Sequence, residues 1–235
     1  MILAFDTAGP HCAVALAAVE GPVRRLVASR AEAMAKGQAE RLFPMIEEVL
    51  EEGAAAWSDL AGLACGTGPG NFTGVRVAVS AARGLSLSLG VPAVGVTAFE
   101  PLRAETDARH VLASLPAPKG RALVQPFDGA APGPARTIEV AAPPSDLQLP
   151  TDMRVIGHEA EAIARAYEAR AVRPAVDPLS LADDPDLLAA YPAWRIACLA
   201  LARLEAGAAP GRPTPLYVRA PDAAPPRHAP PAIVS

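Results

Sequence analysis

The stretch CGTGPGNFTGVR, residues 65–76, decides the fold of this chain. A short apolar run, residues 60–65, precedes it, and a long apolar segment without a helix breaker, residues 75–89, follows it. This order predicts a strand, a glycine-rich turn and a helix. Glycines permit backbone conformations that side chains forbid, so a turn of this kind gathers N–H groups and a helix N-terminus at one point. Such a point either holds an anion or lets another chain approach closely.

The turn does not match the common glycine loops. A dinucleotide fingerprint, Gly-x-Gly-x-x-Gly, would need glycine where the chain has Asn71 or Thr73. The chain contains no Gly-Lys pair for a phosphate-binding P-loop, and no serine stands between glycines as in a nucleophile elbow. The pattern leaves open a purely structural turn that packs a strand tightly against a helix.

The sequence around the turn predicts a mixed α/β unit. Strands are expected at residues 1–7, 12–18 and 23–29 as an antiparallel meander, and further strands at 60–65 and 93–96. Helices are expected at residues 38–52 and 72–89, and the first has an apolar stripe at helical spacing. This order of elements is that of one actin-like, sugar-kinase-like (RNase H-like) lobe, with a five-stranded mixed sheet. The stripe consists of Leu42, Met45, Ile46, Val49 and Leu50.

Several motifs resemble the TsaB (YeaZ) family. The central motif is GPGNFTGVR, residues 68–76, continued by RGL at 83–85 and GVPAVGVT at 90–97. The opening MILAFDTA (1–8), the helix segment ERLFPMI (40–46) and the closing PLYVR (215–219) are also similar to family segments. The resemblance is dense over residues 1 to about 100, thin in the middle, and returns near residue 215.

The resemblance implies an actin-like fold and a role in making N6-threonylcarbamoyladenosine at position 37 of tRNA. It implies a non-catalytic subunit that forms a heterodimer with TsaD, which carries out the chemistry. The ATPase TsaE would join the pair, and tRNA would be reached through the complex. The sequence leaves open a homodimer of the isolated chain, contact of this subunit with tRNA, and a different function as a small actin-like ATPase or kinase with its own nucleotide site.

Three regions are expected along the chain. Residues 1–106 would form the first lobe, residues 107–206 a smaller second lobe of the same type, and residues 207–235 a proline-rich, partly flexible tail in which 215–219 docks as a short ordered piece. In the second lobe, strands are predicted at 111–115, 122–127 and 154–157, and helices at 159–169 and 194–205.

Composition favours a cytoplasmic chain. Half of the residues are apolar (51%), but no segment is apolar over a length that crosses a membrane, and the chain starts with a strand containing Asp6 rather than a secretory signal. The formal net charge of −4 is not typical of a protein that grips tRNA alone. The expectation is therefore no membrane partner, and tRNA contact only within a complex.

No catalytic or metal-binding constellation is visible in the sequence. The three cysteines and four histidines are scattered without metal-ligand spacing, and no nucleophile lies in a pattern with a base. A peptidase would need either a metal site or a nucleophile with its base. The family's helix commonly has a histidine where this chain has Gln38, and its Asp-Ala-Arg motif is Pro116-Ala117-Pro118 here. We therefore expect no enzymatic activity of its own, no catalytic residue, no metal site and no cofactor.

A residual nucleotide or Mg²⁺ site within the complex is the open alternative. It would involve the acid at the end of the first strand and the glycine turn. The structural alternative is that this acid accepts hydrogen bonds from the adjoining turn. The residues concerned are Asp6, Thr7, Gly68 and Gly70.

The helices at 38–52 and 72–89 are hypothesised to form the surface that meets TsaD. Small residues at four-residue spacing along the second helix, starting at Gly74 and Ala78, let another backbone approach. On this hypothesis Gly74→Leu or Ala78→Leu leaves the monomer folded and abolishes co-purification with TsaD. The alternative is that these residues face the protein's own sheet. The expected contact residues are Arg41, Met45, Glu48, Thr73, Gly74, Val77, Ala78 and Ala81.

Overall fold

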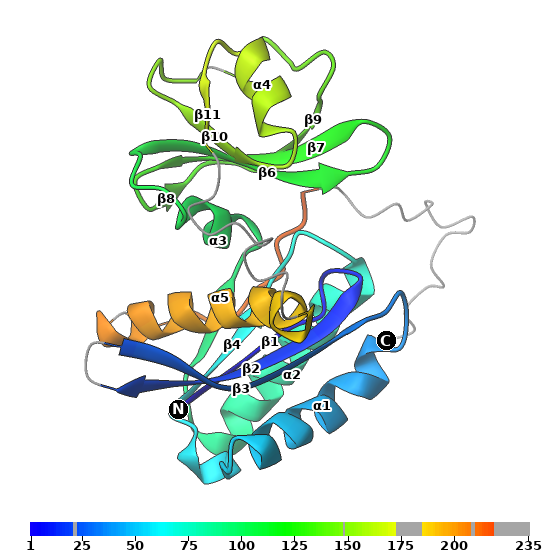
Figure 1. Ribbon diagram of the computed structural model, residues 1–235, viewed down its shortest axis with the longest axis vertical. Coiled ribbons are helices and arrows are strands. Elements are labelled where there is room, and N and C mark those ends of the chain that lie inside the picture. Colours follow the sequence, from blue (N-terminus) through cyan, green and yellow to red (C-terminus); the bar gives the residue numbers. More distant parts are fainter. Residues whose placement is uncertain (21–22, 148, 173–184, 208–209, 219–235) are drawn as a thin grey trace, which may run out of the picture.

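Two β-sheets with separate apolar cores form two lobes stacked along the long axis of the molecule (Figure 1). The computed structural model describes residues 1–20, 23–147, 149–172, 185–207 and 210–218. Among the described helices, none combines the length and apolarity that a bilayer span requires.

The first sheet has five strands in the order β3-β2-β1-β4-β5. β1 (Ile2–Asp6), β2 (His11–Glu20) and β3 (Val23–Ala33) pair antiparallel, whereas β4 (Gly62–Gly66) and β5 (Ala93–Val96) continue from β1 in parallel. Every residue of β1 and β4 is buried, as expected for central strands covered on both faces. The predicted meander and the five-stranded mixed sheet are confirmed.

Helices α1 (Gln38–Glu52) and α2 (Phe72–Leu89) cover one face of this sheet and have the predicted bounds. The apolar stripe of α1 is buried as predicted, because its period matches the helix and its polar side faces solvent. Gly53 ends α1, and Pro44 lies inside the helix on its exposed side. A short 3₁₀ turn, η1 (Trp57–Asp59), precedes β4 and was not predicted.

The second sheet repeats the topology of the first. β6 (His110–Ala117) pairs antiparallel with β7 (Arg121–Asp128) and parallel with β10 (Arg154–Gly157). β9 (Arg136–Glu139) and the two-residue β8 (Ala131–Pro132) pair with β7, and β11 (Arg170–Val172) pairs parallel with β10. The order β9-β7-β6-β10-β11 thus mirrors β3-β2-β1-β4-β5, and it confirms a second lobe of the same type.

This second lobe is smaller for a structural reason. α4 (Ala160–Ala166) occupies the place of α2 and is shorter than the predicted helix 159–169. Between β9 and β10, where the first lobe has α1, the described residues of 140–153 form turns and irregular structure. The prolines at 143, 144 and 150 disfavour a helix there.

The two lobes exchange their last helices. α3 (Phe99–Arg103) follows β5 but packs on β6 and β10 of the second sheet, and sequence analysis did not predict it. α5 (Pro185–Glu205) follows β11 but lies across β1, β2 and β3, on the face opposite α1 and α2 (Figure 1). The sequence placed the helix 194–205 in the unit 107–206, and its packing contradicts that placement, because its small residues fit the alanine-rich face of the first sheet. The boundaries of the predicted regions otherwise stay a prediction. The alanines in contact are Ala197 and Ala200 on α5 and Ala4, Ala17 and Ala64 on the sheet.

Further contacts join the lobes. Arg203 on α5 pairs with Glu100 on α3 and donates to the Gly95 carbonyl at 2.9 Å. Residues 210–218 form a strap along the other side: the Leu216 N–H donates to the Thr67 carbonyl at 2.9 Å, and Val218 packs against the second-lobe core. Residues 215–218 therefore dock as predicted, whereas the predicted flexible tail from 219 onward lies outside the described residues.

Candidate functional site

The glycine-rich turn is held by contacts within the chain. Asn71 is the N-cap of α2, and its Oδ1 accepts hydrogen bonds from the N–H groups of Thr73 (3.0 Å) and Gly74 (3.2 Å). The Asn71 N–H itself donates to the Ala8 carbonyl at 2.7 Å. A Cβ on Gly70 would lie 2.2 Å from that carbonyl oxygen, so only glycine lets the two turns approach this closely. The donors that would hold an anion at this helix start are therefore already engaged.

Asp6 and His11 form a pair across the turn between β1 and β2. Oδ1 of Asp6 accepts a hydrogen bond from the Ala8 N–H at 2.9 Å, as the structural alternative predicted. Nε2 of His11 lies 3.1 Å from Oδ2 of the same carboxylate. Gly66 is packed against Asp6 so tightly that a Cβ there would lie 2.2 Å from Oδ1. The carboxylate is thus fixed at the end of the central strands.

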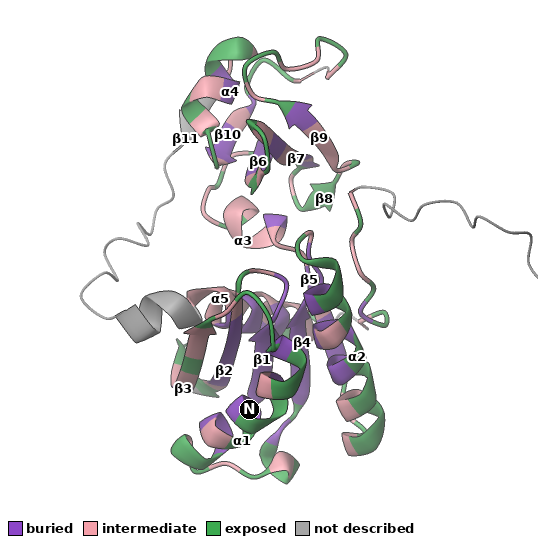
Figure 2. Ribbon diagram, turned by 90° about the vertical axis from the view of Figure 1, so that its right-hand side faces the viewer, coloured by how far each residue is buried: buried purple, intermediate pink, exposed green. Residues whose placement is uncertain are grey.

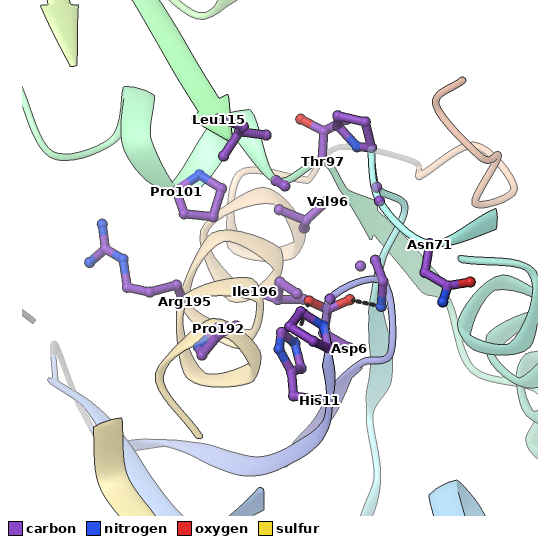
Figure 3. A pocket seen from close by; sticks show the side chains of 18 of the residues that line it. Asp6, His11, Asn71, Val96, Thr97, Pro101, Leu115, Pro192, Arg195 and Ile196 are labelled. Carbon is purple, nitrogen blue, oxygen red and sulfur yellow. Dashed lines mark hydrogen bonds and ion pairs between the residues drawn. The ribbon is translucent and has the colours of Figure 1, made fainter. Parts of the chain in front are cut away.

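Three of the four residues proposed for a residual nucleotide site border one cavity. Asp6, Gly68 and Gly70 line a pocket of about 680 Å³ between the lobes (Figure 3). Thr7 does not line it, because its hydroxyl points the other way and donates to the Gly74 carbonyl at 2.6 Å. Sequence reasoning missed His11, Tyr191 and Arg195, which also line the pocket. His11 follows Asp6 across a tight hairpin and could have been found, whereas Tyr191 and Arg195 arrive through the exchanged helix α5.

Four of the residues expected at the partner surface are buried in the first lobe instead. Met45 and Ala78 have no exposed surface, and Ala81 and Gly74 are also buried within the α1–α2–sheet core. A Cβ on Gly74 would lie 1.8 Å from the Thr7 carbonyl oxygen. The expectation that these four residues contact a partner is wrong, and Gly74→Leu cannot leave the fold intact. The small residues of α2 serve the helix's own packing against the sheet.

Arg41 and Glu48 lie at the surface, where they join α1 to β3. The Arg41 guanidinium holds Glu32 of β3 through Nε (2.9 Å) and Nη2 (2.6 Å), and it holds Glu48 through Nη1 and Nη2, both at 2.7 Å. Arg30 of β3 extends the network to Glu48 (3.4 Å) and to Glu52 (3.1 Å). Hydrogen bonding from Arg41 lowers the pKa of both Glu32 and Glu48. These residues hold the flank of α1 that faces β3.

Large apolar side chains are exposed on the outer sides of α1 and α2. Phe43 on α1 is 45% exposed, and Leu87 on α2 is 88% exposed. Also on α2, Thr73 is exposed and Val77 is half-buried. At the start of α2 the Phe72 ring stacks under the Arg76 guanidinium at 3.7 Å and contacts the Tyr217 ring at 5.3 Å. Figure 2 shows exposed residues along the outer sides of both helices.

The thiols carry no reactive chemistry. Cys12 and Cys65 are buried, and burial raises their pKa to about 11 and about 12, so both stay protonated at neutral pH. Cys198 is half-buried, and burial raises its pKa as well. In the part of the chain that the structure describes, no group of three or more His, Cys, Asp or Glu side chains is placed to hold a metal.

Two lobes of repeated topology with exchanged helices and a cavity between them define a protein of the actin-like, sugar-kinase-like class. Comparisons with known proteins agree. The family model of TsaD, tRNA N6-adenosine threonylcarbamoyltransferase, matches residues 27–116. A Pseudomonas aeruginosa crystal structure of a protein similar to peptidase YeaZ matches with a TM-score of 0.64 and 25% identity, over 93% of this chain and 99% of that one. YeaZ from the same species matches with a TM-score of 0.62 and 23% identity, over 92% and 98%.

Relatives in sequence give a narrower assignment. The tRNA threonylcarbamoyladenosine biosynthesis protein TsaB of Escherichia coli K12 is 34% identical over 123 residues, which is 51% of each chain. The protein of the same name from Buchnera aphidicola subsp. Schizaphis graminum is 36% identical over 97 residues, 41% of this chain and 44% of that one. These alignments span about half the length of the curated relatives. Together with the motifs and the fold, these matches make the chain similar to proteins of the TsaB (YeaZ) family.

Proposed function

We propose that this chain is a non-catalytic subunit required for threonylcarbamoyl transfer to N6 of adenosine 37 in tRNA. It acts by binding and supporting a TsaD-type protein, and the ATPase TsaE joins the pair. The observation that carries the proposal is that the motifs resembling TsaB proteins at residues 40–46 and 68–76 lie on α1, the glycine turn and the start of α2. Contact with tRNA and any enzymatic activity are properties of the complex with the TsaD-type protein and not of the isolated chain.

The similarity to TsaD supports pairing between related lobes. The matched residues 27–116 contain both α1 and α2, so a TsaD-type protein offers a related pair of helices. Two similar helix pairs can pack across an approximate two-fold axis, the commonest symmetry of protein dimers. The same geometry permits a homodimer when the partner is absent.

The proposed surface keeps only Thr73 and Val77 of the contact residues first expected. We place exposed apolar side chains at the centre of this surface, because burying such side chains on association is the main source of binding energy. Phe43 lies on the flank of α1 away from Arg41 and Glu48, since residues two positions apart point to different sides of a helix. The proposed surface consists of Phe43 on α1 and Phe72, Thr73, Val77 and Leu87 on α2.

Phe43→Asp tests this surface. It places a charge where the partner would bury an aromatic ring, and hot-spot losses of this kind amount to about 2 kcal/mol or more. We expect the variant to keep the melting temperature of the wild type and to lose co-purification with the TsaD-type protein of the same organism.

Val23→Asp is the matched control. Val23 is 60% exposed on β3 and lies outside the proposed surface, so this variant keeps the partner. Retention of the partner by Phe43→Asp, or equal loss by both variants, would overturn the assignment of the surface. ATP turnover by the purified wild-type chain would instead favour the actin-like ATPase alternative.

A further inference from the structure

The pocket between the lobes is separate from the proposed partner surface. It is bordered by the β1–β2 turn, the glycine turn, α3, the β6–β7 hairpin and α5, whereas the outer sides of α1 and α2 contribute none of its lining. Its volume of about 680 Å³ lies within the range of small-molecule sites, roughly 300–1,000 Å³.

The walls of the pocket are apolar on both lobes. Val96 and Ile196 come from the first lobe and α5, Pro101 from α3, and Leu115 and Leu123 from the second sheet. Figure 3 shows Leu115 and Pro101 on one side of the space, with Val96 and Ile196 between them and Asp6. Such walls favour a ligand with an apolar or aromatic body.

The opposite side of the pocket presents the Asp6 carboxylate. An ionised carboxylate has about four acceptor positions, and the Ala8 N–H and His11 use two of them. The Asp6 side chain keeps 13% of its surface exposed, and Figure 3 shows the carboxylate at the lower side of the cavity. It can therefore accept further hydrogen bonds from a ligand.

The charges around the cavity disfavour anions. Arg195 lines the pocket and is paired through Nη2 with Glu105, whose carboxylate balances its charge, while its Nε has no hydrogen-bond partner among the described residues. The N–H groups at the start of α2 are capped by Asn71. Among the described lining residues, Asp6 is the only carboxylate, and its printed partners are the Ala8 N–H and the His11 ring.

We propose that the interlobe pocket binds a small organic molecule with an apolar or aromatic body and a positively charged amine or amidine group that donates to Asp6. Phosphates and carboxylates are excluded, because each would bring a second negative charge toward this carboxylate in a poorly solvated space. The site is thus selective against nucleotides, although it lies beside the glycine turn. The inference does not depend on the proposed partner role.

A matched set of three probes tests the charge preference. 2-Naphthamidine, 2-naphthamide and 2-naphthoate share one ring system and carry a positive, a neutral and a negative group. Ligand-observed NMR with the full chain is expected to give affinities in the order amidine, amide, carboxylate, with about tenfold between the first two from the charge-assisted hydrogen bond. ATP with Mg²⁺ is the fourth probe and is expected not to compete with 2-naphthamidine.

Three variants locate the binding. Ala35→Trp fills the rim of the pocket from an exposed position, so it abolishes binding of all probes without disturbing the core, whereas Ala39→Trp on the exposed side of α1 changes nothing. Asp6→Asn keeps an acceptor for the Ala8 N–H and removes the preference for the amidine over the amide. Absence of binding, equal binding to both Trp variants, or preference for naphthoate or ATP would each overturn the proposal.

Discussion

Single atoms decide how close the turns of the first lobe can come. Gly74 and Gly70 face backbone carbonyls of the β1–β2 turn, at Thr7 and Ala8, where a Cβ has no room. The sequence indicated a close approach at this turn but could not show whether the approaching backbone belongs to the same chain. The structure shows that it does, which is why Gly74 is a packing residue and not a partner contact.

Substitution of Gly74 tests this constraint. Gly74→Ala places a Cβ 1.8 Å from the Thr7 carbonyl oxygen, and the strain should lower the free energy of unfolding by about 2 kcal/mol or more. Gly84→Ala is the control in the same helix, because a Cβ there has open space. It should raise the free energy of unfolding by about 0.5–1 kcal/mol through helix propensity. Urea denaturation measures both, and equal effects would contradict the close approach.

The Arg41 network predicts a pH dependence. Arg41 lowers the pKa of Glu32 and Glu48 below their ordinary 4.5, so their contribution is present above pH 4.5 and is lost as the pH falls through their folded pKa values. Both carboxylates are about two-fifths exposed, so solvent screening limits the contribution. Arg41→Gln should lower the free energy of unfolding by about 1 kcal/mol at pH 7 and by much less at pH 3. A cost that is constant between these pH values would refute the carboxylate origin.

Long periodic elements were predictable, whereas several short elements and the exchange of helices between the lobes were not. The apolar stripe of α1 and the unbroken apolar run of α2 set both helices with their observed bounds, because each buries a whole face. β8, β9 and β11 contain two to four residues. They form because they pair with neighbouring strands, and this pairing cannot be predicted from the local sequence. The place of α5 depends on alanines of the first sheet that lie far away in sequence. Its sequence indicates a helix but not which sheet it covers.

The packing of α5 is testable at one position. Ala200 is fully buried against the first sheet, and Ala200→Leu would overfill this contact and lower the free energy of unfolding by about 1–3 kcal/mol. Ala206→Leu, at an exposed position just beyond the helix, should have little effect. Thermal and urea unfolding of the full chain compare the two. An inert Ala200→Leu would mean that α5 does not cover the sheet in this way.

At the scale of the molecule, one topology is used twice for different purposes. The first lobe carries two full-length helices on its outer face, and the TsaD family model matches residues 27–116, which contain both helices. Among its described residues the second lobe has no counterpart of α1, and it closes the interlobe pocket with Leu115 and Leu123. Sequence analysis could predict both lobes from strand and helix order. It could not predict the pocket, because its lining comes from both lobes and from the exchanged helices.

Exchange of α3 and α5 makes the lobes interdependent. Each helix covers the sheet of the other lobe. Two ion pairs connect α5 to α3 and the residues just after it: Arg203 pairs with Glu100, and Arg195 pairs with Glu105. The strap at 210–218 adds a connection from Thr67 to the second-lobe core. The platform proposed for a partner is therefore supported by the whole chain rather than by residues 1–106 alone.

The most direct test of the central claim is the N6-threonylcarbamoyladenosine content of tRNA, measured by mass spectrometry of nucleosides from cells that lack the endogenous gene. We expect the modification to be lost without this chain, restored by the wild type and by Val23→Asp, and not restored by Phe43→Asp expressed at the same level. Undiminished modification in cells without the chain, or full restoration by Phe43→Asp, would contradict a docking platform on α1 and α2.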